Sequence, residues 1–252
     1  MRFQDRVALI SGAGAGIGRA TASIIGREGG TVVAVDLDQT ALDKLAAEIG
    51  SPRTLAVRAD ALDAGAVENL VRRAVDAHGK IDILVNAVGG STIIPRPNAT
   101  LDELTLEEWQ KLIHFNLTGT FLFCHAVTPV MKRQGSGKIV NISSIAGRGV
   151  SPTSSSAYAT AKGGIIAFTR KLSFELGPYG VTVNAIAPSL TLSPRLRPRW
   201  DRLSPEEQAR ENARVPLGRV AVPEDQAKVI CFLASSDADF VNGVTIDVNG
   251  GQ

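Results

Sequence analysis

The chain has 252 residues, and its 27 basic and 25 acidic side chains leave a formal net charge of +2. Because no block of like charges stands out, the sequence argues against binding to nucleic acid or to an anionic membrane surface. Cys124 and Cys231 lie far apart, each in an apolar stretch, which is typical of buried thiols in a reducing compartment. The first residues lack the apolar core of a signal peptide, and no apolar stretch is long enough to span a bilayer, so we expect a cytoplasmic protein with no membrane partner.

Short β-branched runs alternate with longer stretches in which apolar residues recur every three or four positions. The runs predict strands at residues 6–11, 31–36, 54–58, 81–85, 138–143, 181–186 and 244–248. The longer stretches predict helices at residues 16–28, 39–49, 64–78, 106–133, 157–176 and 224–235. Such alternation is typical of a parallel sheet covered on both faces, because parallel strands need long crossovers. We therefore predict an α/β fold, a single doubly wound domain over residues 1–252 with a seven-stranded parallel sheet and helices on both faces.

Residues 189–215 interrupt this alternation. They contain three prolines and a polar helical stretch after Ser204, but no strand pattern. An insertion of this length in a compact domain is usually functional and often covers a binding site. We therefore predict that this segment is a substrate lid.

A glycine-rich turn follows the first predicted strand and opens directly into a helix. Its glycines fit the spacing Gly12-x-x-x-Gly16-x-Gly18, whereas the general dinucleotide fingerprint fails because Ile17 occupies its sixth position. Glycines let the backbone approach a pyrophosphate, whose charge then meets unpaired N–H groups and the positive end of the helix dipole. The strand, turn and helix context favours a dinucleotide site over a merely structural loop.

Asp36 ends the second predicted strand, eighteen positions after Gly18. A carboxylate there can accept both hydroxyl protons of an adenosine ribose and would repel a 2′-phosphate, which favours NAD(H) over NADP(H). Neither Ala15 nor Leu37 supplies a cation for such a phosphate. The alternative is that Asp36 only caps the helix that follows.

Tyr158 and Lys162 are four positions apart on a predicted helix, so their side chains share one face. A free tyrosine titrates near pH ~10, and an adjacent ammonium together with an oxidised nicotinamide would lower the phenol pKa towards neutrality. Such a phenol can act as an acid or a base, although a solvated surface pair is the alternative for Tyr-x-x-x-Lys alone. Ser144 follows the fifth predicted strand, at the sheet edge where its hydroxyl could hold a substrate oxygen.

The sequence resembles the classical short-chain dehydrogenase/reductase family over essentially its whole length. Beyond the glycine spacing and Tyr158-x-x-x-Lys162, the resemblance rests on Asn86-Ala87-Val88-Gly89, on Asn116 within Phe-Asn-Leu-Thr-Gly-Thr-Phe, on Ile-Ser-Ser-Ile-Ala-Gly around Ser144, and on Pro-Leu-Gly-Arg before Pro223-Glu224-Asp225. It implies a Rossmann-type fold and hydride transfer. Three positions depart from the family pattern: Ala87 replaces a second asparagine, Ser189 replaces the glycine of Pro-Gly, and Asn249 stands where the family often has Asp.

The resemblance implies four catalytic residues. Tyr158 would be the acid or base, Lys162 would lower its pKa and bind the nicotinamide ribose, Ser144 would hold the substrate oxygen, and Asn116 would hold a proton-relay water. Ser143 is the alternative to Ser144, and alignment of Ser-Ile-Ala-Gly favours Ser144. The expected cofactor contacts are Gly12, Ala15, Gly16, Ile17, Gly18, Asp36, Asp60, Ala61, Asn86, Ala87, Val88, Gly89, Tyr158, Lys162, Pro188, Ser189 and Thr191. The three histidines share no metal-ligand spacing, so no metal is expected.

We therefore predict an NAD(H)-dependent oxidoreductase that transfers a hydride between the nicotinamide and the carbon of a secondary alcohol or ketone. The alternatives are an NADPH-dependent 3-oxoacyl thioester reductase and a non-catalytic NAD-binding regulator. A homotetramer is expected by family resemblance, and because the successive apolar residues 121–123 cannot all face one core. Arg195, Arg197 and Arg199 in the predicted lid could bind an anionic group of the substrate, or they could form an ordinary solvated loop.

Overall fold

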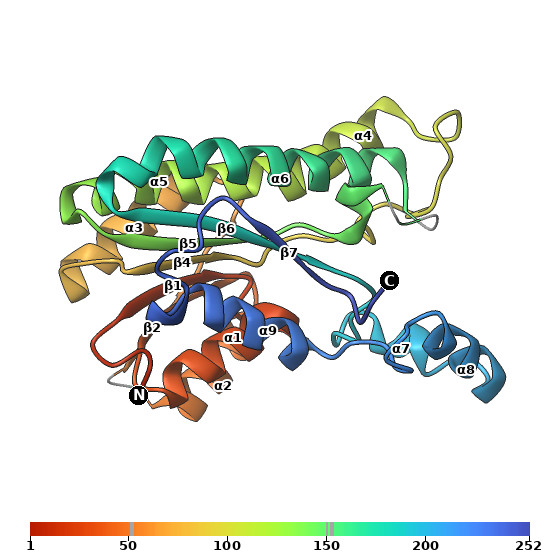
Figure 1. Ribbon diagram of the computed structural model, residues 1–252, viewed down its shortest axis with the longest axis horizontal. Coiled ribbons are helices and arrows are strands. Elements are labelled where there is room, and N and C mark those ends of the chain that lie inside the picture. The colour runs from red at the N-terminus through yellow and green to blue at the C-terminus, as the bar shows by residue number, and fades with distance from the viewer. Residues whose placement is uncertain (51–52, 150, 152–153) are drawn as a thin grey trace.

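Seven parallel strands form one sheet in the order β3-β2-β1-β4-β5-β6-β7 (Figure 1). They are β1 (Val7–Ser11), β2 (Thr31–Asp36), β3 (Thr54–Arg58), β4 (Ile83–Asn86), β5 (Gly137–Ile142), β6 (Val181–Pro188) and β7 (Thr245–Val248). This computed structural model describes residues 1–50, 53–149, 151 and 154–252. The strand order reverses between β1 and β4, and in open sheets the carboxyl ends of two such strands border a crevice.

Helices cover both faces of the sheet, as predicted. In Figure 1, α1 (Gly16–Arg27), α2 (Gln39–Ile49) and α9 (Pro223–Leu233) lie on one face. The opposite face carries α3 (Ala64–His78), α5 (Gly119–Gln134) and α6 (Ser156–Leu176), and α4 (Leu106–Ile113) lies beyond them. Three short helical turns, η3 (Ile145–Arg148), η4 (Gly177–Tyr179) and η5 (Ser236–Ala238), lie between these elements.

Both faces of the sheet are packed, which explains why the strands are apolar throughout. In β2, Val33 and Val35 join the cluster under α3 and α5, whereas Val32 and Ala34 join the cluster under α1, α2 and α9. Successive side chains of a strand point to opposite faces, so each strand needs apolar residues at consecutive positions. Cys124 and Cys231 are free and buried in these two clusters, and burial raises the pKa of each thiol to about 12.

Most of the predicted elements begin or end one or two residues away from the observed ones, and two of the differences are informative. The helix predicted over residues 106–133 is interrupted by a π-helical turn, η2 (His114–Thr118), which separates α4 from α5. The fourth strand begins at Ile83 rather than at Ile81, because the backbone N–H and carbonyl of Ile81 are both bonded to the Gln134 side chain. The repeat of apolar residues could predict neither boundary, because it carries no information about the hydrogen bonds of polar groups.

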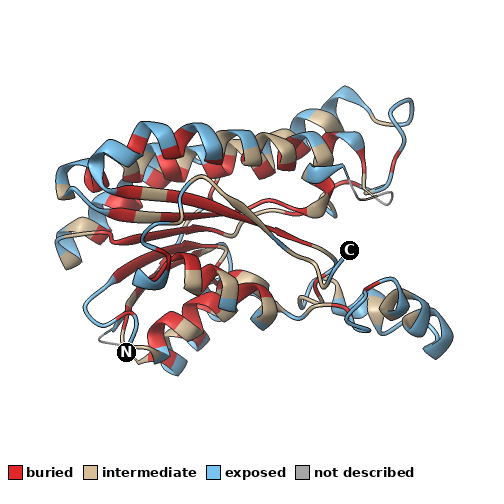
Figure 2. Cartoon of the chain, viewed as in Figure 1, coloured by how far each residue is buried: buried red, intermediate tan, exposed pale blue. Residues whose placement is uncertain are grey.

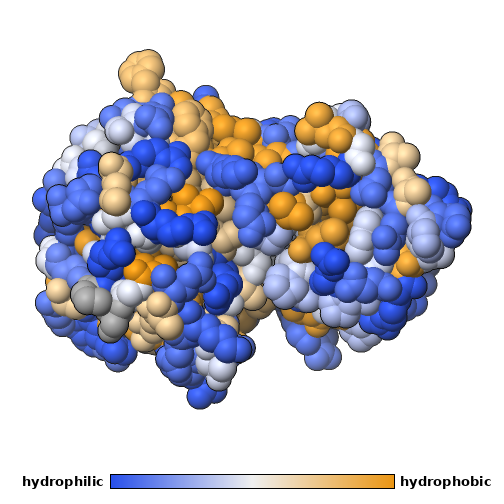
Figure 3. All heavy atoms as spheres, turned by 90° about the horizontal axis from the view of Figure 1, so that it is seen from below, coloured by the Kyte–Doolittle hydropathy of each residue, from blue (hydrophilic) through white to orange (hydrophobic). Residues whose placement is uncertain are grey.

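The segment between β6 and α9 projects from the rest of the chain. It contains α7 (Arg197–Trp200) and α8 (Pro205–Ala213). Helix α8 corresponds to the polar helical stretch predicted after Ser204, and Ser204 and Glu207 form a capping box at its first turn. Neither helix has a buried residue, and Figure 2 draws most of the segment as exposed. Figure 3 shows it as a lobe set off from the main body by a notch. A parallel bridge between Thr191 and Ala221 holds the two stems of this segment together.

None of the helices in the described part of the chain has the length and apolar character needed to cross a membrane.

Candidate active site

The glycine turn between β1 and α1 lies at the strand reversal. Gly12 has a left-handed backbone with φ of 68°, and a Cβ there would lie 3.0 Å from the carbonyl carbon of Ala87. Gly18 packs against the carbonyl of Gly12 with no room for a side chain. Within the described residues no side chain caps α1 at Ala15, and its first turn holds no acid. Free N–H groups and the positive end of the helix dipole therefore suit a phosphate group here.

Asp36 is held against the glycine turn. One oxygen of its carboxylate accepts the Gly14 N–H at 3.0 Å, and the other accepts the Asp38 N–H at 3.2 Å. The N-cap of α2 is Asp38, whose side chain accepts the Ala41 N–H at 3.0 Å. The alternative that Asp36 caps this helix is therefore wrong, and its carboxylate stands at the end of β2 beside the turn.

Arg58 lies next to Asp36, and the sequence reasoning missed it. The two residues are partners in the parallel register of β2 and β3, and the Arg58 Nε donates to the carbonyl oxygen of Leu37 at 3.1 Å. The only signal in the sequence would have been the register of the two predicted strands. A cation is thus present at the place where Ala15 and Leu37 supply none.

Two of the predicted cofactor residues at this edge of the sheet, Asn86 and Asp60, form hydrogen bonds within the protein through their side chains. Asn86 donates to Asn141 Oδ1 at 2.8 Å and to the Cys124 sulfur at 3.3 Å, so its side chain lies in the core. The Asp60 side chain accepts the Leu62 N–H at 2.9 Å, at the exposed end of β3. The backbone of the turn from Asn86 to Gly89 therefore remains as the part able to contact a ligand.

The residues after β6 use their hydroxyl groups internally. Ser189 Oγ donates to the Asn249 carbonyl at 3.4 Å, and Thr191 Oγ1 donates to the Ser189 carbonyl at 3.1 Å. Thr191 also accepts from Gln226 Nε2 at 3.3 Å. A contact to a ligand from Ser189 or Thr191 would therefore come from the backbone.

Two adjacent serines after β5 have separate surroundings. Ser143 Oγ donates to the carbonyl oxygen of Lys162 at 2.8 Å, so it fastens β5 to α6. Ser144 Oγ accepts the Ala146 N–H at 3.2 Å, which caps η3, donates to the Pro188 carbonyl at 3.5 Å, and interacts with the Tyr158 phenol so as to lower its pKa. Of the two candidates, Ser144 is the one beside the phenol.

Lys162 and Asn116 meet at the loop after β4. The Lys162 ammonium donates to the Ile142 carbonyl at 2.8 Å and lies 5.8 Å from the centre of the Tyr158 ring. Asn116, at the π-helical turn, accepts the Gly90 N–H at 2.8 Å and donates to the Leu112 carbonyl at 2.9 Å. A Cβ on Gly89 would lie 2.9 Å from both Asn116 Oδ1 and Lys162 Nζ. The loop can follow this path only with glycine at that position.

Burial governs the protonation of the two groups on α6. It raises the pKa of Tyr158 against smaller lowering effects from the Ser144 hydrogen bond and the charge of Arg195. Burial, followed by the charge of Arg195, lowers the pKa of Lys162 to about 7. In the protein alone, burial thus outweighs the stabilisation of the phenolate. That Lys162 lowers the phenol pKa beside a bound oxidised nicotinamide stays a prediction.

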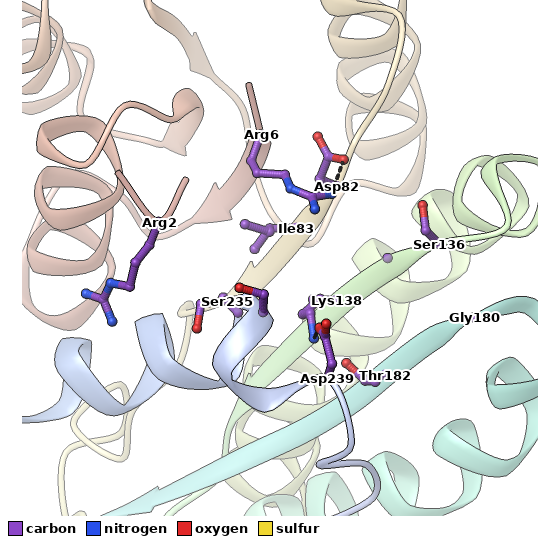
Figure 4. A pocket seen from close by; sticks show the side chains of 13 residues that line it. Arg2, Arg6, Asp82, Ile83, Ser136, Lys138, Gly180, Thr182, Ser235 and Asp239 are labelled. Carbon is purple, nitrogen blue, oxygen red and sulfur yellow. Dashed lines mark hydrogen bonds and ion pairs between the residues drawn. The ribbon is translucent and has the colours of Figure 1, made fainter. Parts of the chain in front are cut away.

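A polar cavity lies at the opposite edge of the sheet from these residues, where β4, β5 and β6 begin (Figure 4). Its cations face acids: Arg6 pairs with Asp82 at 3.2 Å, and Lys138 pairs with Asp239 at 2.7 Å. None of the predicted site residues lines it. The residues with chemistry instead gather at the carboxyl edge, around Tyr158 and the glycine turn.

A family model described as enoyl-(acyl carrier protein) reductase matches residues 12–252. The chain belongs to the classical short-chain dehydrogenase/reductase family. This short-chain dehydrogenase/reductase is 38% identical to a 3-oxoacyl-(acyl-carrier-protein) reductase of Thermotoga maritima, over 100% of the chain and 99% of that relative. It is 34% identical to a 2-dehydro-3-deoxy-L-rhamnonate dehydrogenase (NAD(+)) of a Sphingomonas species, over 100% and 96% of the two chains. Its fold matches the crystal structure of levodione reductase with a TM-score of 0.89 at 34% identity, covering 100% and 98%.

Proposed function

We propose that this oxidoreductase uses NAD(H) to interconvert a secondary alcohol and a ketone. The observation that carries the proposal is the convergence of Ser144, Tyr158 and Lys162 beside a glycine turn suited to a dinucleotide phosphate. The non-catalytic alternative, an NAD-binding regulator, would need no buried phenol beside a serine hydroxyl and a lysine at this edge of the sheet. The contact between Ser144 and Tyr158 therefore favours an enzyme.

When bound, the nicotinamide supplies or accepts the hydride. The proposed role of Tyr158 is to give its phenolic proton to the carbonyl oxygen during reduction and to take it back during oxidation. Ser144 donates a hydrogen bond to that oxygen and stabilises the charge that develops on it. Lys162 binds the nicotinamide ribose, and Asn116 positions the proton-relay water that would connect this pair to solvent. Asn116 is fully buried, and it ties the loop after β4 to the π-helical turn, which fixes its orientation.

Asp36 supports the choice of NAD(H). Its carboxylate is oriented by two backbone N–H groups beside the glycine turn, where it would accept from the adenosine ribose and repel a 2′-phosphate. A relative of the chain is named as an NAD(+) enzyme. The second candidate is an NADPH-dependent 3-oxoacyl thioester reductase, which is favoured by the relative of that name and by Arg58 beside Asp36.

We also propose that residues 189–215 cover the substrate as a lid, and that the protein is a cytoplasmic homotetramer. The lid is supported by Gly16, where a Cβ would lie 3.3 Å from Ser193, so the segment passes over the glycine turn. The tetramer is supported by apolar side chains on α5 and α6 that the chain leaves in solvent, among them Phe121 at 46% and Phe174 at 66% exposure.

A spectrophotometric screen tests the activity. Secondary alcohols, polyols, hydroxy acids and hydroxyacyl thioesters are offered with NAD⁺ and, separately, with NADP⁺, and formation of the reduced nicotinamide is followed. Turnover with NAD⁺ that falls by at least ~10²-fold in Tyr158→Phe supports the proposal, because that is the usual cost of losing a general acid or base. Strict preference for NADP⁺ and hydroxyacyl thioesters would favour the second candidate. Binding of NAD⁺ without turnover of any substrate would favour the regulator.

A further inference from the structure

One arginine of the segment between β6 and α9 reaches the residues around Tyr158. Arg195 Nη2 donates to the carbonyl oxygen of Gly89 at 3.1 Å, across a sequence separation of 106 residues. The guanidinium occupies the space that a side chain on Gly90 would fill. Among the described residues, this is the one side-chain hydrogen bond between residues 193–211 and the chain before β6. The arginine is exposed, and its guanidinium is held against the loop after β4.

Arg195 lies near a second basic side chain, that of Lys162. Gly89, whose carbonyl it contacts, lies against Lys162 Nζ and Asn116 Oδ1. Burial lowers the pKa of Lys162, and the charge of Arg195 lowers it further. Burial raises the pKa of Tyr158, and the charge of Arg195 opposes that rise. Within the described chain neither Arg195 nor Lys162 forms an ion pair. The reacting end of the site therefore carries an excess of positive charge that an anion would offset.

The neighbouring arginines are arranged differently. Arg197 pairs with Asp201 at 2.8 Å along α7, and Arg202 Nε donates to the Pro198 carbonyl at 3.0 Å. Arg199 is exposed and makes no side-chain hydrogen bond in the described chain, so it serves as a matched control. Arg195 alone among them lies over the loop that carries Gly89 and Gly90.

We infer that Arg195 binds a small oxyanion, a carboxylate or a phosphate, on the same molecule whose hydroxyl or carbonyl meets Tyr158 and Ser144. This inference rests on the proposed function and narrows its substrates to hydroxy acids, oxo acids or their phosphorylated counterparts. A guanidinium has five N–H donors in a planar fork, and Arg195 directs one of them to Gly89, so the fork is oriented while other donors remain. A carboxylate can accept two parallel bonds from such a fork.

The test uses probes that need no turnover. The enzyme–NADH complex is titrated with isobutyrate, with its neutral analogue isobutyramide and with inorganic phosphate, and binding is followed by nicotinamide fluorescence. The wild-type protein should bind isobutyrate or phosphate at least ~10-fold more tightly than isobutyramide, as expected for hydrogen bonds to a charged group. The stronger of the two anions identifies the group. Arg195→Gln should abolish the difference, and Arg199→Gln should retain it.

Three results would overturn the inference. Equal binding of isobutyrate and isobutyramide to the wild-type protein, with no preference for phosphate, would mean that no anion site exists. Equal losses for all three probes in Arg195→Gln would mean that this arginine shapes the segment. Weaker binding of NADH itself in Arg195→Gln would assign the residue to the cofactor. A failure of the proposed function is distinguishable from these results: none of the alcohols, polyols, hydroxy acids or hydroxyacyl thioesters of the screen would then be turned over with either dinucleotide.

Discussion

The Lys162 ammonium donates a hydrogen bond to the carbonyl oxygen of Ile142 at 2.8 Å while only 3% of the residue is exposed to solvent. Its pKa is lowered from 10.5 to about 7, mainly by burial. Between these two values Lys162 carries its proton in the unfolded chain but not in the folded chain, so its contribution to the free energy of unfolding rises with pH. The rise should reach at most about 1.4 kcal/mol per pH unit and end near the unfolded pKa.

Replacing this side chain should remove the dependence. Between pH 7 and 10 we expect the slope of unfolding free energy against pH to be less positive in Lys162→Met than in the wild-type protein, and the opposite contribution of the two buried thiols is common to both proteins. Urea unfolding at several pH values in this window measures both slopes. Equal slopes in the two proteins would mean that Lys162 keeps its proton throughout the window.

The raised pKa of Tyr158 predicts opposite pH dependences for the two reaction directions. The protonated phenol, which reduction requires, persists through neutral pH, whereas oxidation requires the phenolate. Oxidation should therefore accelerate as the pH rises above neutrality, and reduction should slow at high pH. Profiles of kcat/KM in both directions test this, with a deuterated alcohol used to establish that hydride transfer limits the rate. A flat oxidation profile under that condition would contradict the assignment of Tyr158.

Ser143 and Ser144 form a matched pair of variants. Ser144→Ala should lower kcat by about 10²-fold, the usual cost of one hydrogen-bond donor to a developing oxyanion. Ser143→Ala should leave kcat nearly unchanged and lower the unfolding free energy by about 1 kcal/mol, because only its bond to the Lys162 carbonyl is lost. Steady-state kinetics and urea unfolding of both variants measure the two effects. An inactive Ser143→Ala beside an active Ser144→Ala would reverse the roles.

Asp36 and Arg58 should together decide the preference between NAD(H) and NADP(H). Asp36→Ala removes the repulsion of a 2′-phosphate, and Leu37→Arg adds a cation at a position that is 59% exposed. The double variant should shift the ratio of kcat/KM values towards NADP(H) by about 10- to 100-fold, as for hydrogen bonds to a charged group. If Arg58 is a partner of the 2′-phosphate, adding Arg58→Ala to Asp36→Ala should reduce the shift of the kcat/KM ratio towards NADP(H). A wild-type protein that already prefers NADP(H) would refute the role given to Asp36.

Phe121 on α5 should hold subunits together. It is 46% exposed and stacks on His125 with the ring centres 5.4 Å apart, so it presents an apolar surface to solvent. We expect the wild-type protein to be a tetramer in light scattering at micromolar concentration, and Phe121→Asp to give smaller species with an unchanged circular dichroism spectrum. A wild-type monomer would dispose of the tetramer.

The sequence was sufficient for the sheet, because strands buried on both faces are apolar at every position. It left open which serine faces Tyr158, since that depends on a hydrogen bond from Ser143 to Lys162, and whether Asp36 caps α2, since Asp38 nearby can cap the same helix. The π-helical turn around Asn116 leaves the apolar pattern of its helix intact and so gave no signal. The sequence also offered Arg195, Arg197 and Arg199 as equals, and only the three-dimensional path of the segment separates them.

The bridge between Thr191 and Ala221 makes the intervening residues an exchangeable cassette. The Leu192 N–H donates to the Ala221 carbonyl at 2.8 Å, so the segment that leaves β6 and leads to α9 begins and ends at one narrow neck. A cassette of another length can close on the same neck, because the entropy of loop closure grows only slowly with chain length. Chimeras spliced at these two positions could therefore exchange substrate preference while the dinucleotide half of the enzyme stays intact. Natural insertions and engineered replacements of this segment can therefore both be joined to the fold at Thr191 and Ala221.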